Sequence, residues 1–478
     1  MQQFGSLGSD PPSEYSLNRA VHPVRGRGLL SKTCFRAKGV SSETISALSG
    51  HALSKRARAC NRDHSAALMK DFLFLPWIEA HGDVLLREIF EPDPDIALIP
   101  LRMTPAGDKV ARRALFHFAS RHPQTYARLF ERYLLAVPGP VHGLVLTHDW
   151  AGPMRIAAEV AQSHGVPVIL IPHEGIFLDE TLYYRSPLTG ENCSIADQFL
   201  AWGHLQKDIM VSRGYPAEKV VVISSPKLQK AARYAPQLTR AAYCRELGLD
   251  PDRKIVMFCA QTLDNVTDMQ TARTRQAEAV LELDAFCREH GHQLLLRLPP
   301  VQHESYLQKA LREELGEGGP LCVKPGDPGI AAEPHEATWH ADCVTSISST
   351  MLLEKGLMDG PSMAFDYLAE TSPFVARGRL PAVRAPGELA DLLPGLLDTT
   401  TRSFPAEGWA QLEHDYSSGS FDSQSAIPDA QAIIKAYDTP FDLRTQQPKA
   451  RGGFLFPKLM CAVHAVIFKT FIQLFRAG

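Results

Sequence analysis

Several protein classes are excluded by what the 478-residue sequence lacks. It has no run of 18 uninterrupted apolar residues, so an ordinary transmembrane helix is not predicted. The first ten residues are polar and are not followed by the apolar core of a secretory signal. The net charge is only −3, which gives no bulk attraction to nucleic acid. None of the nine cysteines stands at C-x-x-C spacing, which favours reduced, buried thiols in a cytosolic protein.

Common cofactor signatures are also missing. No G-x-G-x-x-G follows a predicted strand, so binding of a nicotinamide or flavin cofactor is not expected. The absence of G-x-x-x-x-G-K-[ST] argues against a P-loop NTPase. His335 and His340 are five residues apart, a spacing that does not place them on one face of a helix. No zinc site, and no other metal or cofactor site, is therefore predicted.

Short apolar runs alternate with segments of helical period along the middle of the chain. Residues 143–149 and 166–172 read as strands on either side of a helix at 154–163, which makes a βαβ unit. Their continuous apolar character is typical of parallel strands covered on both faces. We therefore predict an α/β protein with two Rossmann-like, doubly wound domains that face a central cleft. The predicted domains cover residues 66–235 and 236–390.

The individual elements follow from the same patterns. Further strands are predicted at 71–76, 95–100, 198–202, 219–224, 254–260, 293–298, 343–347 and 361–365. Helices are predicted at 107–135, 231–246, 270–290 and 348–358. Residues 391–448 are predicted to form helices that pack back on the first domain.

Both ends of the chain are basic. Residues 1–65 carry ten Lys or Arg against four Asp or Glu and have little hydrophobic periodicity, so we predict a flexible leader rather than a specific binding arm. Residues 449–478 combine large apolar side chains with five Lys or Arg and no acidic residue. This composition suits a helix on a membrane surface with anionic lipids. A helix docked on the protein and a dimer contact are the alternatives.

The first candidate site is a turn after the strand at 166–172. His173, Glu174 and Gly175 follow Pro172 and should lie at the carboxyl edge of the sheet, where open α/β sheets bind ligands. An imidazole or a carboxylate there can accept a proton from a hydroxyl, and Asp149 ends the neighbouring strand. We therefore predict His173, Glu174 and Asp149 as catalytic. The alternative is a histidine that only bonds loop carbonyls.

The second candidate site lies in the second domain. Ser348, Ser349 and Thr350 follow a strand and open a helix, where backbone N–H groups attract phosphate. The same hydroxyls are also ordinary helix caps. Glu354, farther along this helix, is a candidate partner for the ribose hydroxyls of a nucleotide.

Other strand ends of the second domain supply further candidates for contacts with a phosphate or a base. Arg297 and His303 are the first and last residues of the segment RLPPVQH. The alternative there is a solvated loop with a rigid Pro-Pro turn. Gln261 follows the first strand of the second domain.

Four segments follow one another in a recognisable order. Residues 169–175 read ILIPHEG, and residues 196–203 read ADQFLAWG. Residues 214–226 read GYPAEKVVVISSP, and residues 341–354 read ADCVTSISSTMLLE. Together these segments resemble the GT-B glycosyltransferase superfamily, in particular bacterial capsular and surface-polysaccharide transferases and CDP-glycerol glycerophosphotransferases. The resemblance covers roughly residues 140–430. Two departures stand out, because the family's "R.HP" is RLPP here and its "GsP" is SSP.

The resemblance implies a nucleotide-linked donor whose phosphates lie near Ser348, Ser349 and Thr350. It implies an acceptor near His173 or Glu174, and no need for a metal. We expect a cytoplasmic glycosyltransferase, peripheral on the inner face of the membrane, that adds a sugar to a lipid-linked or oligosaccharide acceptor in a growing bacterial surface glycan. A nucleotide-sugar 2-epimerase and a non-catalytic scaffold that binds glycan or protein are the alternatives.

Overall fold

The computed structural model describes residues 69–78, 93–101, 109–173, 188–263, 268–299, 306–422 and 426–443, with a few residues between these ranges. The predicted leader at 1–65 and the predicted membrane-surface segment at 449–478 lie outside the described residues. Among the helices that are described, none is long and apolar enough to cross a membrane.

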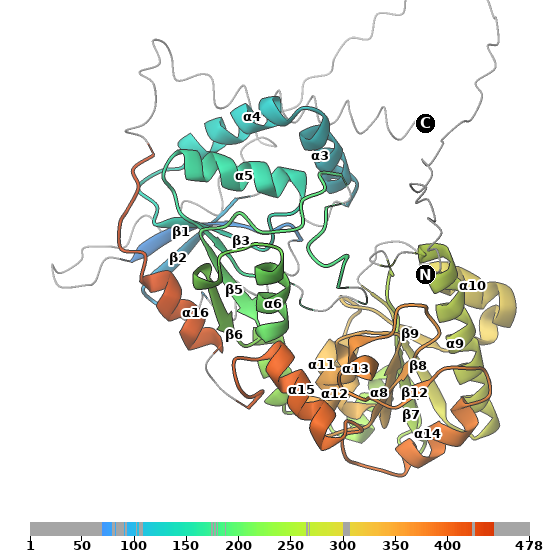
Figure 1. The fold of residues 1–478 in the computed structure, drawn as a ribbon. Coiled ribbons are helices and arrows are strands. Elements are labelled where there is room, and N and C mark those ends of the chain that lie inside the picture. Colours follow the sequence, from blue (N-terminus) through green and yellow to red (C-terminus); the bar gives the residue numbers. More distant parts are fainter. Residues whose placement is uncertain are drawn as a thin grey trace, which may run out of the picture. The chain divides into compact units, whose positions relative to one another are not determined.

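Six parallel strands form the first sheet, in the order β2-β1-β3-β4-β5-β6 (Figure 1). The strands are β1 Lys70–Leu75, β2 Ile96–Pro100, β3 Gly143–Leu146, β4 Val168–Leu170, β5 Gln198–Trp202 and β6 Val220–Ile223. The chain winds outward from β1 in both directions, so the strand order reverses between β1 and β3. Ligands of open α/β sheets bind outside the carboxyl ends of the strands at such a reversal.

The second sheet is also fully parallel, in the order β12-β11-β10-β7-β8-β9. The strands are β7 Ile255–Cys259, β8 Gln293–Arg297, β9 Leu321–Val323, β10 Cys343–Ser346, β11 Ser362–Phe365 and β12 Ala382–Val383. Read from β9, this is the strand order 3-2-1-4-5-6 of dinucleotide-binding folds, with its reversal between β7 and β10. The prediction of two doubly wound α/β domains is confirmed.

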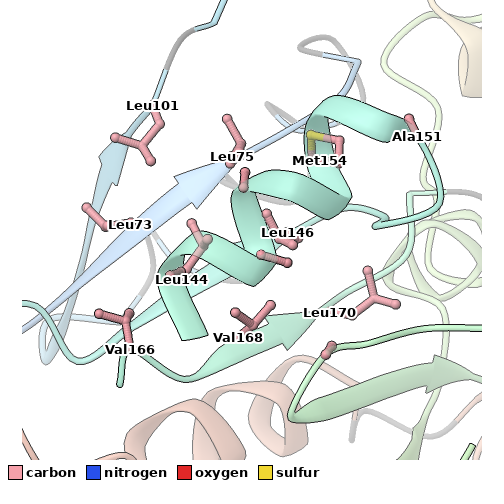
Figure 2. Close-up of a cluster of buried hydrophobic side chains, with 14 of the residues drawn as sticks. Leu73, Leu75, Leu101, Leu144, Leu146, Ala151, Met154, Val166, Val168 and Leu170 are labelled. Atoms are coloured by element: carbon pink, nitrogen blue, oxygen red, sulfur yellow. The ribbon is translucent and has the colours of Figure 1, made fainter. Parts of the chain in front are cut away.

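Alternating side chains of the first sheet pack on two helical layers. Leu73, Leu144 and Leu170 face helices α3 Lys109–Arg121, α4 Pro123–Leu135 and α5 Gly152–Ser163. Figure 2 shows this cluster, with Met154 of α5 lying over the leucines of β1 and β3. The intervening side chains of the same strands face α16, Ala426–Lys435. Because both faces are covered, the strands are apolar along most of their length, and polar residues occur only where β1 and β5 begin.

Of the remaining helices, α6 connects β5 and β6 of the first sheet, and the others lead into the second sheet, connect its strands or follow it. They are α6 His204–Ser212, α7 Pro226–Ala232, α8 Arg240–Leu247, α9 Met269–Glu289, α10 Tyr306–Leu315, α11 Pro334–His340, α12 Met351–Leu357, α13 Pro373–Ala376, α14 Leu389–Leu397 and α15 Ala406–Tyr416. Short 3-10 turns occur at Ala217–Lys219, Gly316–Gly318 and Ile330–Ala332. The six described cysteines are free thiols.

Three helix predictions were wrong in their bounds. The segment predicted as one helix at 107–135 forms α3 and α4, which are separated at His122 because a residue before proline is driven out of the helical region. The predicted helix at 231–246 is likewise two helices, with Thr239 capping the second. The helix predicted from Ser348 begins at Met351.

The last helices do not all pack on the same domain. α14 packs on α9 of the second sheet, and the predicted domain boundary at 391 falls inside it. α15 contacts α6, and α16 contacts β6 and α7. Lys435 of α16 pairs with Asp93 and Asp95, which lie before β2. The chain that follows the second sheet therefore returns to the first.

Candidate functional site

Polar and aromatic residues gather at the carboxyl edge of the first sheet. Thr147, His148 and Asp149 follow β3 directly, and His173 follows β4 after two residues. A cavity of about 10 Å³ between these segments has room for a group the size of one water molecule or hydroxyl. It is lined by Thr147, His148, Trp150, Leu170, Pro172, His173, Tyr183 and Tyr184.

His173 is a buried, neutral imidazole. Its Nδ1 lies 3.2 Å from the carbonyl oxygen of Thr147, and because a carbonyl only accepts, Nδ1 is the donor. The neutral ring then carries its lone pair on Nε2. Burial lowers the pKa of His173 to about 4, and the nearby Arg112 acts in the same direction. The loop-carbonyl contact is thus present, and it fixes the tautomer that a general base requires.

The rest of the His-Glu-Gly turn is only partly described. Glu174 lies outside the described residues. Gly175 packs closely on the helix that follows β5, because a Cβ added to it would lie 3.3 Å from Nε2 of Gln206. A side chain at this position would push the turn away from α6.

Asp149 is fully buried and holds a distant loop in place. Its Oδ2 accepts hydrogen bonds from the Ser194 hydroxyl at 2.9 Å and from the Ile195 N–H at 2.8 Å. Its own N–H donates to the Tyr184 hydroxyl at 3.0 Å. Burial raises the pKa of Asp149 to about 6, although these hydrogen bonds oppose the shift. The carboxylate therefore anchors the segment before β5 and is not presented to solvent.

The buried Asp149 predicts a specific pH dependence of stability. A carboxyl group whose pKa is about 6 in the folded chain, against 3.8 when exposed, stabilises the fold fully below pH 3.8, and this contribution is lost as pH rises through 6. Relative to Asp149→Asn, the wild type should lose about 2.4 kcal/mol of unfolding free energy between pH 4 and pH 7.

Urea unfolding of both proteins at several pH values measures this difference. Asp252→Asn serves as the control, because Asp252 is exposed and the same exchange there removes no buried charge. Parallel stability curves for Asp149→Asn and the wild type would show that Asp149 does not titrate in this range.

In the second half, Gln261 and Ser348 bridge the point where the strand order reverses. Gln261 follows β7 and Ser348 follows β10, the two strands on either side of the reversal. Oε1 of Gln261 accepts from the Ser348 N–H at 2.9 Å, and its Nε2 donates to the Ser348 hydroxyl at 3.2 Å. The Ser349 N–H donates to the Ser346 hydroxyl at 3.3 Å. Two of the backbone donors predicted to meet phosphate thus already have acceptors within the chain.

Thr350 and Lys227 of α7 form a polar cluster around the buried carboxylate of Glu354. The Thr350 hydroxyl donates to Oε1 of Glu354 at 2.8 Å and accepts from Nζ of Lys227 at 2.7 Å. Lys227 also pairs with Glu354 at 3.0 Å, and His335 lies 3.5 Å from the other carboxylate oxygen. Burial alone raises the pKa of Glu354, but Lys227 and His335 hold it below its usual range. The cluster ties α12 to the segment that leaves the first sheet.

Arg297 ends β8 at the same edge and is buried. Its position in register places it beside Cys259 of β7, which in turn pairs with Ser346 of β10. Its Nη1 donates to the Ala332 carbonyl at 2.8 Å, and no described residue accepts from its buried Nη2. Burial lowers the pKa of Arg297, whose intrinsic value is high enough that the group remains charged. His303 lies outside the described residues.

A second cavity, of about 210 Å³, is lined by residues that follow strands of both sheets. Gly175, Leu178, Glu180, Tyr183, Leu205 and Ile209 come from the first half, and Thr371, Pro373, Ala376 and Arg377 follow β11. Arg377 binds both carboxylate oxygens of Asp415 in α15. Carboxyl ends of strands from the two sheets thus border one cavity.

The structure brings the predicted residues together as local groups. Gln261 lies with Ser348, and Thr350 lies with Glu354, whereas no described contact joins His173 to Ser348. Two further residues of the sites, Lys227 and His148, were not predicted from the sequence. Lys227 follows the Ser-Pro segment quoted above. His148 precedes Asp149, so its position at a strand end was a signal that could have found it. No group of three or more His, Cys, Asp or Glu within the described residues is arranged to hold a metal ion.

Comparison with solved structures identifies the fold. S. aureus MnaA, solved with UDP, is 14% identical to this chain, with a TM-score of 0.53, and the match covers 80% of this chain and 100% of MnaA. The chain has a GT-B fold. A Listeria monocytogenes protein described as a putative UDP-N-acetylglucosamine 2-epimerase is 13% identical, with a TM-score of 0.52, and the match covers 78% and 97% of the two chains.

A third GT-B structure comes from Methanocaldococcus jannaschii. It is a UDP-GlcNAc 2-epimerase in complex with UDP-GlcNAc and UDP, 12% identical, with a TM-score of 0.50 and a match covering 77% of this chain and all of that one. No protein-family profile matches the sequence, and no curated protein matches it. At these identities, the likeness to GT-B enzymes establishes the fold and no activity.

Proposed function

We propose that this protein is an enzyme that acts on a nucleotide-linked sugar, and that it transfers the sugar to a growing bacterial surface glycan such as a capsule or an O-antigen. The observation that carries the proposal is the chemistry of two strand ends. A neutral imidazole, His173, ends the first-sheet segment, and a buried guanidinium, Arg297, ends a strand of the second sheet. A base for an acceptor and a cation for a phosphate leaving group are what sugar transfer requires.

The donor is proposed to bind at the order reversal of the second sheet. Arg297 has a buried Nη2 without a described acceptor, and a phosphate oxygen would supply one. Ser348 and Ser349 stand at the same edge with hydroxyls that can reach further oxygens. The Ser348 N–H already donates to Gln261, and the Thr350 hydroxyl already donates to Glu354. The positive charge that balances the diphosphate then comes from Arg297, and neither a metal nor an organic cofactor is required.

The acceptor is proposed to bind near His173. In the transfer step, a hydroxyl of the acceptor gives its proton to Nε2 of His173 while its oxygen forms a bond to the anomeric carbon. The bond from that carbon to the donor phosphate breaks, and the phosphate oxygen takes the electron pair. The Thr147 carbonyl, bonded to Nδ1, orients the ring and stabilises the imidazolium that forms.

Other parts of the proposal rest on the sequence. The basic, apolar segment at 449–478 would hold the enzyme on the inner face of the cytoplasmic membrane, where a lipid-linked or oligosaccharide acceptor is presented. Solved GT-B structures described as UDP-GlcNAc 2-epimerases favour a second candidate, epimerisation of a nucleotide sugar at C2. Incubation with UDP-GlcNAc alone, followed by NMR, separates the two, because only an epimerase forms the 2-epimer without an acceptor.

Nucleotide binding is the first test of the proposed donor site. Titration with CMP, CDP, UDP and GDP is expected to raise the melting temperature saturably with one of them, since a ligand that binds only the folded state stabilises it by mass action. Arg297→Met should weaken that nucleotide by about tenfold or more, because a charge-assisted hydrogen bond to phosphate is lost.

Lys324→Met is the matched control, because Lys324 is exposed and follows the neighbouring strand β9. It removes the same charge at the same sheet edge without touching the proposed site. A protein that no nucleotide stabilises would instead be a non-catalytic GT-B scaffold.

A further inference from the structure

His148 is a buried imidazole that the proposed mechanism does not use. Only 3% of the residue is exposed, and neither ring nitrogen has a hydrogen-bond partner among the described residues. Buried polar atoms without partners are rare, because the lost hydration is not replaced. Burial and the neighbouring His173 hold the pKa of His148 well below its usual value, so the ring is neutral and offers one donor and one acceptor.

Two half-buried tryptophans flank this histidine. The Trp150 ring stacks on His148, with centroids 4.8 Å apart and planes at 19°. Trp77 meets His148 edge-on at 5.7 Å. Trp77 follows β1 and Trp150 follows β3, so the two indoles border the strand-order reversal of the first sheet. Ligands of open α/β sheets bind at this position.

The small cavity at this edge connects the histidine to the proposed catalytic base. Trp150, His148 and His173 all line it, and the two imidazole centroids are 5.2 Å apart. Its volume of about 10 Å³ suits a single hydroxyl. A hydroxyl that enters there meets a histidine able to donate to it or accept from it.

We infer that Trp77, His148 and Trp150 form a saccharide-binding subsite, in which a sugar ring lies against the indoles and one of its hydroxyls bonds to His148. A sugar ring has an apolar face of C–H groups, which the negative face of an aromatic ring attracts, and a rim of hydroxyls. The subsite offers both features side by side. A nucleobase would also stack on tryptophan, and displacement of the glycan by UDP is therefore one outcome of the test below.

The assignment of this saccharide as the acceptor rests on the proposed function. The binding of a saccharide at the subsite does not, and it is measured without any nucleotide donor. The full-length protein is applied to an array of bacterial surface oligosaccharides, and the affinity of the best-bound glycan is then measured by calorimetry. The intrinsic fluorescence of the tryptophans should change with the same saturation curve.

His148→Phe keeps an aromatic ring on Trp150 and removes both orphan nitrogens. We expect it to weaken glycan binding by about tenfold, the effect of losing one good hydrogen bond, while its melting temperature stays equal to or above that of the wild type. A histidine with a purely structural role would instead lower the melting temperature and leave glycan affinity unchanged. His148→Leu makes the same test if the larger phenylalanine overpacks the site.

Trp150→Leu should weaken glycan binding by about tenfold or more, because the stacking face is lost. Trp339→Leu is the matched control, since Trp339 lies in α11 of the second half and is 38% exposed. Three results would each overturn the subsite: binding of no glycan on the array, wild-type glycan affinity in the Trp150 and His148 variants, or displacement of the glycan by UDP. Glycan binding that needs Trp150 in a protein that binds no nucleotide would uphold the subsite and refute the transferase.

Discussion

Replacement of His173 by asparagine is expected to lower the rate of sugar transfer at least about 100-fold without lowering nucleotide affinity. A positioned general base contributes about 10²- to 10⁴-fold to such a step, and an asparagine amide has no basic nitrogen. Nucleotide binding should survive, because His173 follows β4 of the first sheet and the nucleotide is proposed to bind at the edge of the second sheet. Turnover with saturating donor measures the first effect, and the shift in melting temperature caused by the nucleotide measures the second.

His122→Asn is the matched control for His173→Asn. His122 is an exposed histidine of the same half, at the start of α4, where its side chain makes no capping bond. Its turnover should equal that of the wild type. If His173→Asn turned over normally as well, the proton of the acceptor would have to leave by another route.

The same histidine also predicts the pH dependence of transfer. Because burial lowers the pKa of His173 to about 4, the ring is neutral throughout the range from pH 8 to about pH 5. The value of kcat/KM should therefore not fall near pH 6.5, where an exposed histidine becomes protonated.

The sheets could be predicted from the sequence because their strands are covered on both faces and read as unbroken apolar runs. The prediction failed where that signal is short or absent. β9 and β12 have three and two residues, too few to show any pattern. α11 buries Glu336, Thr338 and His340, so it carries no apolar stripe that would mark it as a helix. Two of these side chains are bonded by residues distant in the sequence, since Tyr234 bonds Glu336 and the Leu238 carbonyl bonds His340.

The candidate site shows the same division between local and distant information. A strand end in a parallel sheet predicts that His173 and Arg297 lie at carboxyl edges. It does not predict the partners that decide their chemistry. Asp149 was chosen for its carboxylate, and the segment at 194–195 bonds one of its two oxygens, whereas both ring nitrogens of His148 beside it are without described partners. Lys227 and Thr350 meet across 123 residues of chain, a pairing that no local pattern encodes.

Gly203 carries the second large expected effect, this time on stability. Gly203 precedes α6 with a φ of +115°, a conformation that side chains rarely adopt. An added Cβ would lie 2.1 Å from the Asp415 carbonyl oxygen and 2.5 Å from the Tyr416 Cα. Both are backbone atoms of α15, so no rotation of a side chain relieves the contact. Gly203→Ala should lower the free energy of unfolding by about 3 kcal/mol or more, and the melting temperature by about 10 °C.

Gly214→Ala separates the two causes of that loss. Gly214 lies beyond the other end of α6 with a φ of +95°, and a Cβ there would meet nothing within 4 Å. Gly214→Ala should therefore lower the free energy of unfolding only by the cost of the strained backbone, about 1 kcal/mol. Since Asp415 also binds Arg377 at the edge of the larger cavity, displacement of α15 in Gly203→Ala should disturb that pair as well. Equal losses in the two alanine variants would mean that α15 moves aside freely and that its contact with Gly203 does not hold α15 against α6.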